Sequence, residues 1–169
     1  MGEKLHRGGA RDADRRGPGA TRPLALCVAS SGGHLVQMRN LLPALRDYEV
    51  VLAGTTAGGQ DPEAGGVDLV LPDANRWSRV RLIWSAAKIL VLTWRLRPAL
   101  VLSTGAAPGY FALRFGRWFG ARTIWVDSLA NVDSISMAGR LAASHADLVL
   151  TQWEHLEGES GAKYAGSIL

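Results

Sequence analysis

One junction in the sequence constrains the fold more than any other feature. The apolar run Leu24–Ala29 has the composition of a buried strand, and it leads directly into Ser30–Leu35, which holds two glycines and opens a helix. A parallel strand that ends in small residues lets backbone N–H groups approach a ligand, and the N-terminus of the next helix favours negative charge. The junction matches neither of the two common nucleotide loops, Gly-x-x-x-x-Gly-Lys-Ser/Thr and Gly-x-Gly-x-x-Gly. The plainer alternative is a tight turn with a capping serine and an incidental histidine.

His34 is the ionisable residue of this junction, and it would lie at the mouth of the crevice that the junction forms. A histidine titrates near neutral pH, so its side chain can take or give a proton during a reaction. The backbone of Ser31, Gly32 and Gly33, at the start of the helix, suits a phosphate group. The junction is therefore a candidate site for an anionic ligand.

Length and composition indicate one folded domain. The chain has 169 residues, of which 47% are hydrophobic, enough for a core. The single cysteine, Cys27, lies inside the first strand, which excludes a disulfide framework and indicates a reducing compartment. Residues 1–22 carry six Lys/Arg and three acidic residues, so we expect a disordered basic leader before a domain that spans residues 23–169. We expect no secretory signal, because the N-terminus has no apolar segment.

The rest of the chain alternates strand signals with helix signals. Short β-rich runs predict strands, and longer apolar stretches between them predict helices. This alternation predicts an α/β fold, a single Rossmann-like domain with a mostly parallel, doubly wound sheet. The further strands are expected at residues 48–53, 67–71, 99–103, 122–126 and 147–150, with helices at residues 80–96 and from about 106 to 119.

Small and polar residues follow four of these strands. In a doubly wound sheet, ligands bind outside the carboxyl ends of the strands, so these residues are expected to converge on one edge. The convergence is stronger evidence for a site than any single motif. The residues are Ser31, Gly32, Gly33 and His34, then Thr104 and Gly105, then Asp127 and Ser128, and finally Thr151 and Gln152.

Charge is unevenly distributed along the chain. Residues 24–73 hold two Lys/Arg and six Asp/Glu, whereas residues 74–126 hold nine Lys/Arg and no carboxylate. This carboxylate-free stretch also holds five of the six tryptophans. Basic residues interleaved with tryptophans suit an anionic membrane interface, where indoles lie at headgroup level and Lys/Arg meet lipid phosphates. We do not expect nucleic acid as a partner, because apolar bulk surrounds the charges.

The predicted helix at residues 80–96 is the centre of this stretch. It carries basic residues every seven positions, in one narrow polar stripe. Lys88 interrupts the apolar run, and a membrane span needs about 20 apolar residues, so we do not expect this helix to cross a membrane. The helix touches lipid with one face, or it is buried against a partner, or it is an ordinary core helix with snorkelling basic side chains. The candidate membrane-contact residues are Arg81, Trp84, Lys88, Trp94 and Arg95.

Six motifs occur in order between residues 24 and 169. They are residues 29–35 with Gln37, then 103–106, 125–130, 134–141, 151–153 and 163–166. Together they resemble the polysaccharide glycosyltransferase subunits related to the eukaryotic membrane-anchor subunit of the dolichol-linked GlcNAc transferase. They are also similar to the N-terminal half of MurG-type lipid glycosyltransferases. The chain departs from the family at Asp127, where Glu is common, and in its polar leader, since eukaryotic members begin with a membrane-spanning helix.

The resemblance implies a division of labour between two subunits. A GT-B glycosyltransferase has two Rossmann-like halves, and a chain of this length supplies one. A separate small subunit would bind the UDP-sugar donor, with UDP-GlcNAc as the default, and the active site would form between the two. This chain would supply the acceptor side, namely peripheral docking on the cytoplasmic face of an anionic membrane and a pocket for a polyprenyl-diphosphate-linked saccharide. It would bind no cofactor of its own.

Transfer to a sugar hydroxyl needs a base near the attacking oxygen and electrostatic support for the departing diphosphate. His34 is the candidate base, or it orients the acceptor. Asp127 orients His34 or binds a sugar hydroxyl, unless it is only a helix cap or loop carboxylate. Arg140 is a candidate phosphate ligand, with a surface ion pair as the alternative. The remaining acceptor or phosphate candidates are Ser31, Gly32, Gly33, Thr104, Gly105, Ser128 and Gln152.

Two other functions stay open at the level of sequence. One is a self-sufficient small Rossmann enzyme that acts on a nucleotide or nucleotide-sugar, and the other is a non-catalytic membrane anchor that recruits the catalytic subunit. Trp153 is more typical of a core residue than of a sugar platform. We expect no bound metal, because no group of His, Cys and carboxylates has the spacing of metal ligands.

Overall fold

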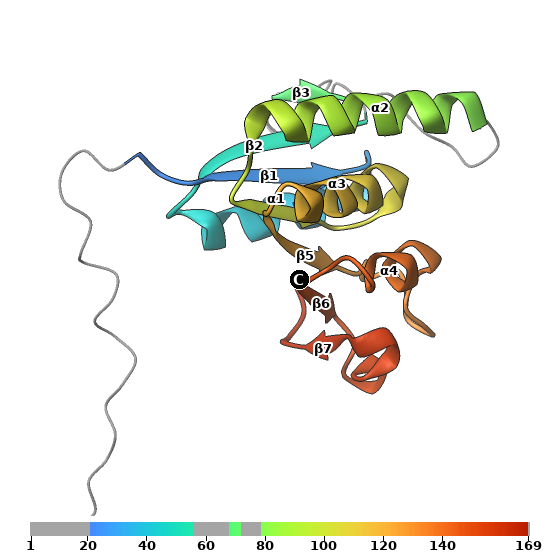
Figure 1. Ribbon diagram of the computed structural model, residues 1–169. Helices are drawn as coiled ribbons and strands as arrows, with labels where there is room; N and C mark the ends of the chain where they lie inside the picture. Colours follow the sequence, from blue (N-terminus) through green and yellow to red (C-terminus); the bar gives the residue numbers. More distant parts are fainter. Residues whose placement is uncertain (1–20, 56–67, 72–78, 169) are drawn as a thin grey trace, which may run out of the picture.

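Seven parallel strands form one sheet in the computed structural model, which describes residues 21–55, 68–71 and 79–168 (Figure 1). The strand order is β3-β2-β1-β4-β5-β6-β7, and every neighbouring pair runs parallel. The predicted Rossmann-like α/β fold is confirmed. The strands are β1 (Leu24–Ala29), β2 (Glu49–Gly54), β3 (Leu69–Val70), β4 (Leu100–Ser103), β5 (Arg122–Val126), β6 (Leu148–Thr151) and β7 (Lys163–Tyr164).

Helices cover both faces of the sheet (Figure 1). On one face lie α2 (Arg79–Leu96), α3 (Ala106–Trp118) and α4 (Met137–Ala142), and on the other lie α1 (Gly33–Leu41) and the short 3-10 helix η1 (Leu42–Leu45). Two further 3-10 turns, η3 (Glu154–Leu156) and η4 (Glu159–Gly161), lie between β6 and β7.

The central strand β1 separates two apolar cores. Its side chains alternate between the two faces because successive residues of a strand point in opposite directions. Leu26 and Val28 pack in the core under α2 and α3, whereas Ala25 and Cys27 pack in the core under α1. Burial raises the pKa of the Cys27 thiol to about 12, so this cysteine stays protonated and is no nucleophile at neutral pH.

Two glycines let α3 lie close against β4. A side chain at Gly109 would overlap the hydroxyl of Ser103, and one at Gly116 would overlap Val101. Because the spacing of these glycines is two helical turns, both lie on the same face of α3. The close packing fixes where the N-terminus of α3 meets the carboxyl edge of the sheet, next to the start of α1.

The structure differs from the predicted elements mainly at the sheet edges. The strand expected at residues 67–71 is only two residues long, and β7 was not predicted, because two exposed residues give no apolar run. The other strands lie within one residue of the prediction. Residues 1–20, most of the predicted leader, lie outside the described residues, as do most of the glycine-rich loop after β2 and Trp77.

Candidate active site at the switch point of the sheet

Two strand–helix junctions meet where the strand order reverses direction. From β1 the sheet continues on one side to β2 and on the other side to β4. His34 follows β1 in the first turn of α1, and Thr104 and Gly105 follow β4 just before α3. Ligands of doubly wound sheets bind at this switch point, outside the carboxyl ends of the strands. The predicted convergence of these residues on one edge is what the structure shows.

His34 and Thr104 are linked by two hydrogen bonds. The hydroxyl of Thr104 donates to the backbone oxygen of His34 at 2.7 Å, and the ring Nδ1 of His34 lies 2.8 Å from the backbone oxygen of Thr104. A carbonyl oxygen only accepts, so Nδ1 must carry the proton. In the neutral ring Nε2 then keeps its lone pair, and no hydrogen-bond partner for Nε2 occurs among the residues that the structure describes. The half-buried ring is therefore oriented as a proton acceptor.

The turn at Gly105 has no room for a side chain. Gly105 has φ of 147°, and a Cβ there would overlap the imidazole ring of His34. The next residue, Ala106, has φ of 66°, in the left-handed region that costs a non-glycine residue about 1–2 kcal/mol. Strained backbone of this kind gathers at functional sites, where the surrounding structure holds it in place.

The loop at Ser31, Gly32 and Gly33 is exposed. The N–H of Ser31 donates to the hydroxyl of Thr55 at 3.0 Å, so the backbone of Gly32 and Gly33 is the part of the loop that suits a ligand. Gly32 needs its positive φ of 77° to enter the helix. Gly33 has no such need, and a side chain there would meet no atom within 4 Å. The folded chain itself therefore does not require a glycine at this position, whereas the close approach of a ligand would. Neither α1 nor α3 has a side-chain cap, so their first N–H groups suit an anion.

Asp127 is buried and accepts four hydrogen bonds. Its exposure is 2%. Oδ1 accepts from the indole of Trp125 at 3.0 Å and from the hydroxyl of Ser136 at 2.5 Å, and Oδ2 accepts from Asn131 at 3.1 Å and from the backbone N–H of Ser136 at 2.9 Å. No hydrogen bond joins the described side chains of Asp127 and His34, and the ring of His34 is held by Thr104. The carboxylate ties the loop after β5 to the capping residue of α4, since Ser136 Oγ also accepts from Gly139 N.

A chain of amides joins α1 to the ends of β5 and β6. Gln152 donates to the side chain of Gln37 at 3.1 Å and to the backbone oxygen of Asp127 at 2.9 Å, and it accepts from the N–H of Ile168 at 3.0 Å. Gln37 donates to Ser128 at 3.4 Å. Sequence reasoning gave Gln37 no role, although its position three residues after His34 places it on the same side of α1.

Arg140 and Trp153 lie in ordinary structural surroundings. Arg140 forms an ion pair with Glu159 at 3.4 Å, with side chains 50% and 34% exposed, and such a pair contributes little to stability. Trp153 packs against the larger core and donates its indole N–H to the backbone oxygen of Leu129 at 2.9 Å. Thr151 is buried, and its hydroxyl accepts from the N–H of Trp153.

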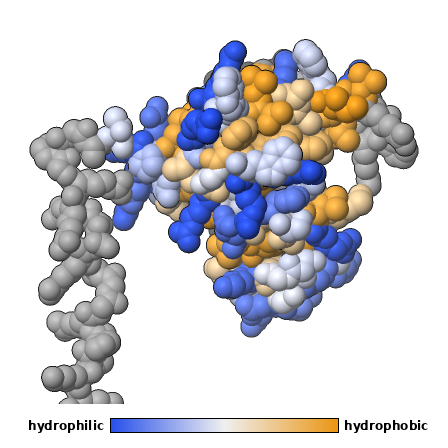
Figure 2. Space-filling view, in the orientation of Figure 1, coloured by the Kyte–Doolittle hydropathy of each residue, from blue (hydrophilic) through white to orange (hydrophobic). Residues whose placement is uncertain are grey.

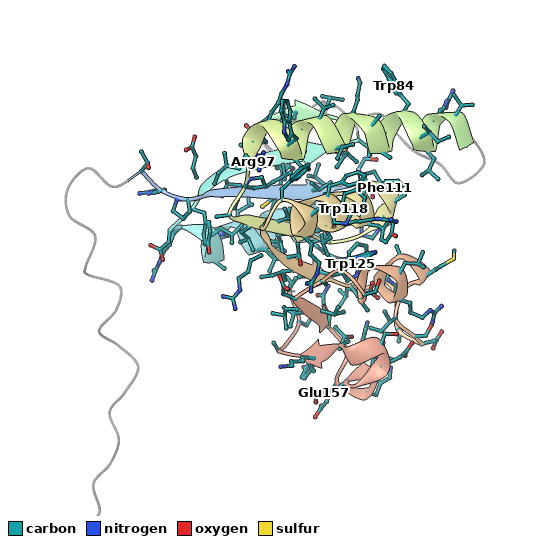
Figure 3. All side chains as sticks on the ribbon, viewed as in Figure 1. Trp84, Arg97, Phe111, Trp118, Trp125 and Glu157 are labelled. Carbon is teal, nitrogen blue, oxygen red and sulfur yellow. The ribbon has the colours of Figure 1, made fainter. Side chains whose placement is uncertain are left out.

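The outer face of α2 is apolar and basic. Figure 2 shows apolar surface over this helix, and Figure 3 shows Trp84 projecting away from the sheet. The exposed apolar side chains Val80, Ile83, Trp84, Val91 and Trp94 lie beside the basic residues Arg81, Lys88 and Arg95, which are exposed as well. The ammonium of Lys88 lies 5.4 Å from the ring centre of Trp84. The five candidate membrane-contact residues therefore share one exposed helix face.

Within the described ranges, no helix is long and apolar enough to cross a membrane. The same residues contain no group of three or more His, Cys, Asp and Glu that could hold a metal ion. The expectation that the chain binds no metal stays a prediction.

Comparison with solved structures places the fold among two-domain enzymes. MurG of Acinetobacter baumannii is 11% identical with a TM-score of 0.66, and the match covers 85% of this chain and 46% of that chain. UDP-N-acetylglucosamine 2-epimerase of Rickettsia bellii is 12% identical with a TM-score of 0.65, covering 87% and 45%. The chain thus spans less than half the length of these proteins, and its fold is that of the N-terminal half of a GT-B enzyme, as predicted.

Comparison at the level of sequence identifies the family. No curated protein matches the chain. A family model does match, over residues 73–168, and its description is "Oligosaccharide biosynthesis protein Alg14 like". The match covers more than half of the chain and includes the switch-point turn after β4, the loop after β5 and α4. The chain therefore belongs to the Alg14-like family of oligosaccharide biosynthesis proteins.

Proposed function

We propose that this chain is the acceptor-side, membrane-associated subunit of a two-component glycosyltransferase. The enzyme would extend a polyprenyl-diphosphate-linked saccharide with a sugar from a UDP-sugar, UDP-GlcNAc being the first candidate. Membership of the Alg14-like family supports a role in oligosaccharide biosynthesis. Family membership favours a separate small subunit that binds most of the donor, and the fold of this domain corresponds to one half of a GT-B enzyme.

The catalytic part of the proposed function rests on one observation, the orientation of the His34 ring. Because Thr104 accepts a hydrogen bond from Nδ1, the lone pair of the neutral ring is on Nε2. A sugar hydroxyl that donates to Nε2 loses its proton to the ring as its oxygen attacks the anomeric carbon of the donor. The bond from that carbon to the diphosphate breaks, and UDP leaves with the electron pair. The carbonyl of Thr104 then stabilises the resulting imidazolium. This geometry supports a general base, and equally a group that orients the acceptor hydroxyl.

The two helix starts beside His34 suit the phosphates of the acceptor. The backbone of Gly32 and Gly33 and the first N–H groups of α3, just after the turn at Thr104 and Gly105, lie at uncapped helix N-termini, which favour negative charge. The N–H groups of Ser31 and Gly105 already donate to Thr55 and Ser103. A diphosphate bound there would hold the first sugar of the acceptor near the imidazole. Arg140 remains a weaker candidate for this role, because its guanidinium already pairs with Glu159.

Asp127, Ser128 and Gln152 would act indirectly, by keeping the backbone around the acceptor site in place. All three are buried and hydrogen-bonded within the chain. They hold the loop after β5 and the end of β6 in fixed positions at the carboxyl edge. We assign them a positioning role for the acceptor rather than a role in proton transfer.

The outer face of α2 would dock the enzyme on an anionic membrane. The exposed side chains of α2 would place tryptophans at headgroup level and basic residues against lipid phosphates. A polyprenyl-linked acceptor is embedded in a membrane, so a peripheral position on its cytoplasmic face would bring the acceptor to His34. The pattern supports peripheral contact through one helix face.

Replacing His34 by alanine tests the catalytic assignment. In the assembled two-subunit enzyme we expect kcat to fall by about 100-fold or more, the usual contribution of a general base. The matched control is His145→Ala, because His145 precedes β6 and lies at the opposite, amino edge of the sheet. Unchanged turnover in His34→Ala would remove His34 from catalysis and favour a non-catalytic anchor.

Nucleotide binding by the chain alone distinguishes the proposed half-enzyme from a self-sufficient Rossmann enzyme. A self-sufficient Rossmann enzyme would bind UDP or UDP-sugar tightly without a partner, whereas a half-enzyme would bind it weakly until the second subunit is added. Calorimetric titration of UDP into the chain alone, and then into the complex, distinguishes the two.

A further inference from the structure

A groove runs between α2 and the edge strand β3. Its volume is about 210 Å³, and its walls are Leu69–Leu71 on the strand side and Lys88, Val91, Leu92 and Arg95 on the helix side. β3 is the last strand at this end of the sheet, so the groove opens at the sheet edge, beside the outer face of α2. It is separate from the switch-point site, which lies at the carboxyl ends of β1 and β4.

The lining combines an apolar floor with two cations. Five of the seven lining residues are aliphatic, and the two polar ones are both basic. Lys88 and Arg95 lie two helical turns apart on one wall, with Val91 and Leu92 between them, a separation of roughly 10 Å along the helix. In the part of the chain that the structure describes, no acidic side chain pairs with either cation. Both side chains are exposed, so the charge of this wall faces solvent.

The size of the groove limits what it holds. Pockets that enclose a whole drug-sized ligand measure about 300–1,000 Å³. A groove of about 210 Å³ is smaller than that, so we expect it to hold one aliphatic chain while a polar headgroup stays outside. Lys88 and Arg95 line the groove and are exposed, so they can reach such a headgroup. An apolar slot with a basic rim matches an amphiphile with one anionic group and a hydrocarbon chain.

We infer that this groove is a discrete binding site for an anionic phospholipid. One acyl chain lies in the slot between β3 and α2, and the lipid phosphate meets Lys88 or Arg95 at the rim. The inference deepens the membrane docking of the proposed function and rests on it. It adds a stoichiometric site, which a general attraction between a basic surface and an anionic membrane does not require.

Titration with a monomeric short-chain lipid tests the site on the full chain alone. The probe is dihexanoyl-phosphatidylglycerol below its critical micelle concentration, and calorimetry measures affinity and stoichiometry. We expect saturable binding of one lipid per chain. The phosphatidylcholine with the same acyl chains lacks the net negative charge, so it should bind at least tenfold more weakly. Inorganic phosphate at the same concentration should not displace the lipid, because it cannot fill the slot.

Matched variants distinguish binding at a discrete site from a general attraction between the basic protein and the anionic lipid. The phosphate meets one of the two cations, so one of the variants Lys88→Gln and Arg95→Gln should weaken binding of the lipid by about tenfold, the effect of a lost charged hydrogen bond. Val70→Thr keeps the β-branched shape of an exposed groove residue, and it should weaken binding about threefold through the lost apolar contact. Arg122→Gln removes the same charge from an exposed position at the start of β5, and it should leave binding unchanged.

The outcomes distinguish this site from the proposed function. Non-saturable binding, equal loss in Arg122→Gln, or displacement by inorganic phosphate would overturn the lipid site. If vesicles of phosphatidylglycerol still recruit the chain in that case, membrane docking stands and only the discrete site is lost. Equal thermal unfolding midpoints of the variants show that the exposed substitutions leave the fold intact.

Discussion

At the scale of single residues, the position of the His34 ring depends on Gly105. The imidazole occupies the space that a Cβ at this position would need. Gly105→Ala should therefore displace the ring and break its contact with the backbone of Thr104. In the ¹⁵N spectrum of the neutral imidazole we expect a single Nδ1–H tautomer in the natural chain and a mixture of tautomers in the variant.

Gly120→Ala is the matched control for this substitution. Gly120 also has a positive φ, of 83°, but a side chain there meets no atom within 4 Å. Both variants carry backbone strain, and only Gly105→Ala should change the spectrum of His34. If both variants gave the same His34 tautomer as the natural chain, the steric account of the site would be wrong.

The sequence predicted the meeting of His34, Thr104 and Gly105 but not the surroundings of Asp127. The first three residues follow strands that are neighbours in the sheet, and strand ends can be read from apolar runs. Apart from Trp125 in β5, the partners of Asp127 come from the loop after β5, at Asn131 and Ser136. The path of such a loop is set by hydrogen bonds between side chains and backbone, which leave no period in the sequence.

At the scale of elements, α2 shows what the periodicity of the sequence can predict and what it cannot. The apolar run predicted the helix to within one residue, and the basic residues spaced by seven predicted one exposed stripe. The pattern did not reveal that the polar residues Ser85 and Thr93 lie on the buried face. It also missed β7, whose two exposed residues follow a 3-10 turn.

Ser85 is a buried hydroxyl whose oxygen has no hydrogen-bond partner among the described residues. A buried polar group without a partner costs about 1–3 kcal/mol, so Ser85→Ala should raise the free energy of unfolding by about 1 kcal/mol. Chemical denaturation measures the change. The comparison is Thr93→Val, because the hydroxyl of Thr93 donates to the backbone oxygen of Ile89 at 2.8 Å. Thr93→Val should not stabilise, and a loss of stability in Ser85→Ala would contradict this account of α2.

Asp147 links α3 to the amino ends of β5 and β6. Burial alone would raise the pKa of this carboxyl. The hydrogen bonds from the backbone and side chain of Thr123 and the Arg117 guanidinium at 2.7 Å outweigh burial and hold the pKa below the usual value of an aspartate. As the pH falls, the unfolded chain therefore takes up this proton before the folded chain does.

The stability that Asp147 contributes should be full above about pH 5 and should be lost as the pH falls through the folded pKa. Denaturation between pH 6 and pH 3 measures this loss, and Asp147→Asn should give a shallower slope. Asp133→Asn, at an exposed position, is the control and should keep the slope of the natural chain. Identical slopes in all three proteins would contradict the assignment.

At the scale of the whole molecule, the sheet presents two different surfaces. The carboxyl edge at the switch point brings together His34, two uncapped helix starts and the buried amides, whereas the face that carries α2 presents tryptophans and basic residues. The sequence predicted both surfaces, the first from the strand ends and the second from the carboxylate-free stretch. It could not predict the groove beside β3, because that groove depends on which strand lies at the edge of the sheet.

The central claim is that this chain is half of a glycosyltransferase. The most direct test is transfer of labelled sugar from UDP-GlcNAc to a polyprenyl-diphosphate-linked saccharide, first by this chain alone and then by the chain mixed with the small UDP-sugar-binding subunit that we propose as its partner. We predict activity only in the mixture, and its loss in His34→Ala. Full activity of the chain alone would place the donor site in this chain and contradict the division of labour between two subunits.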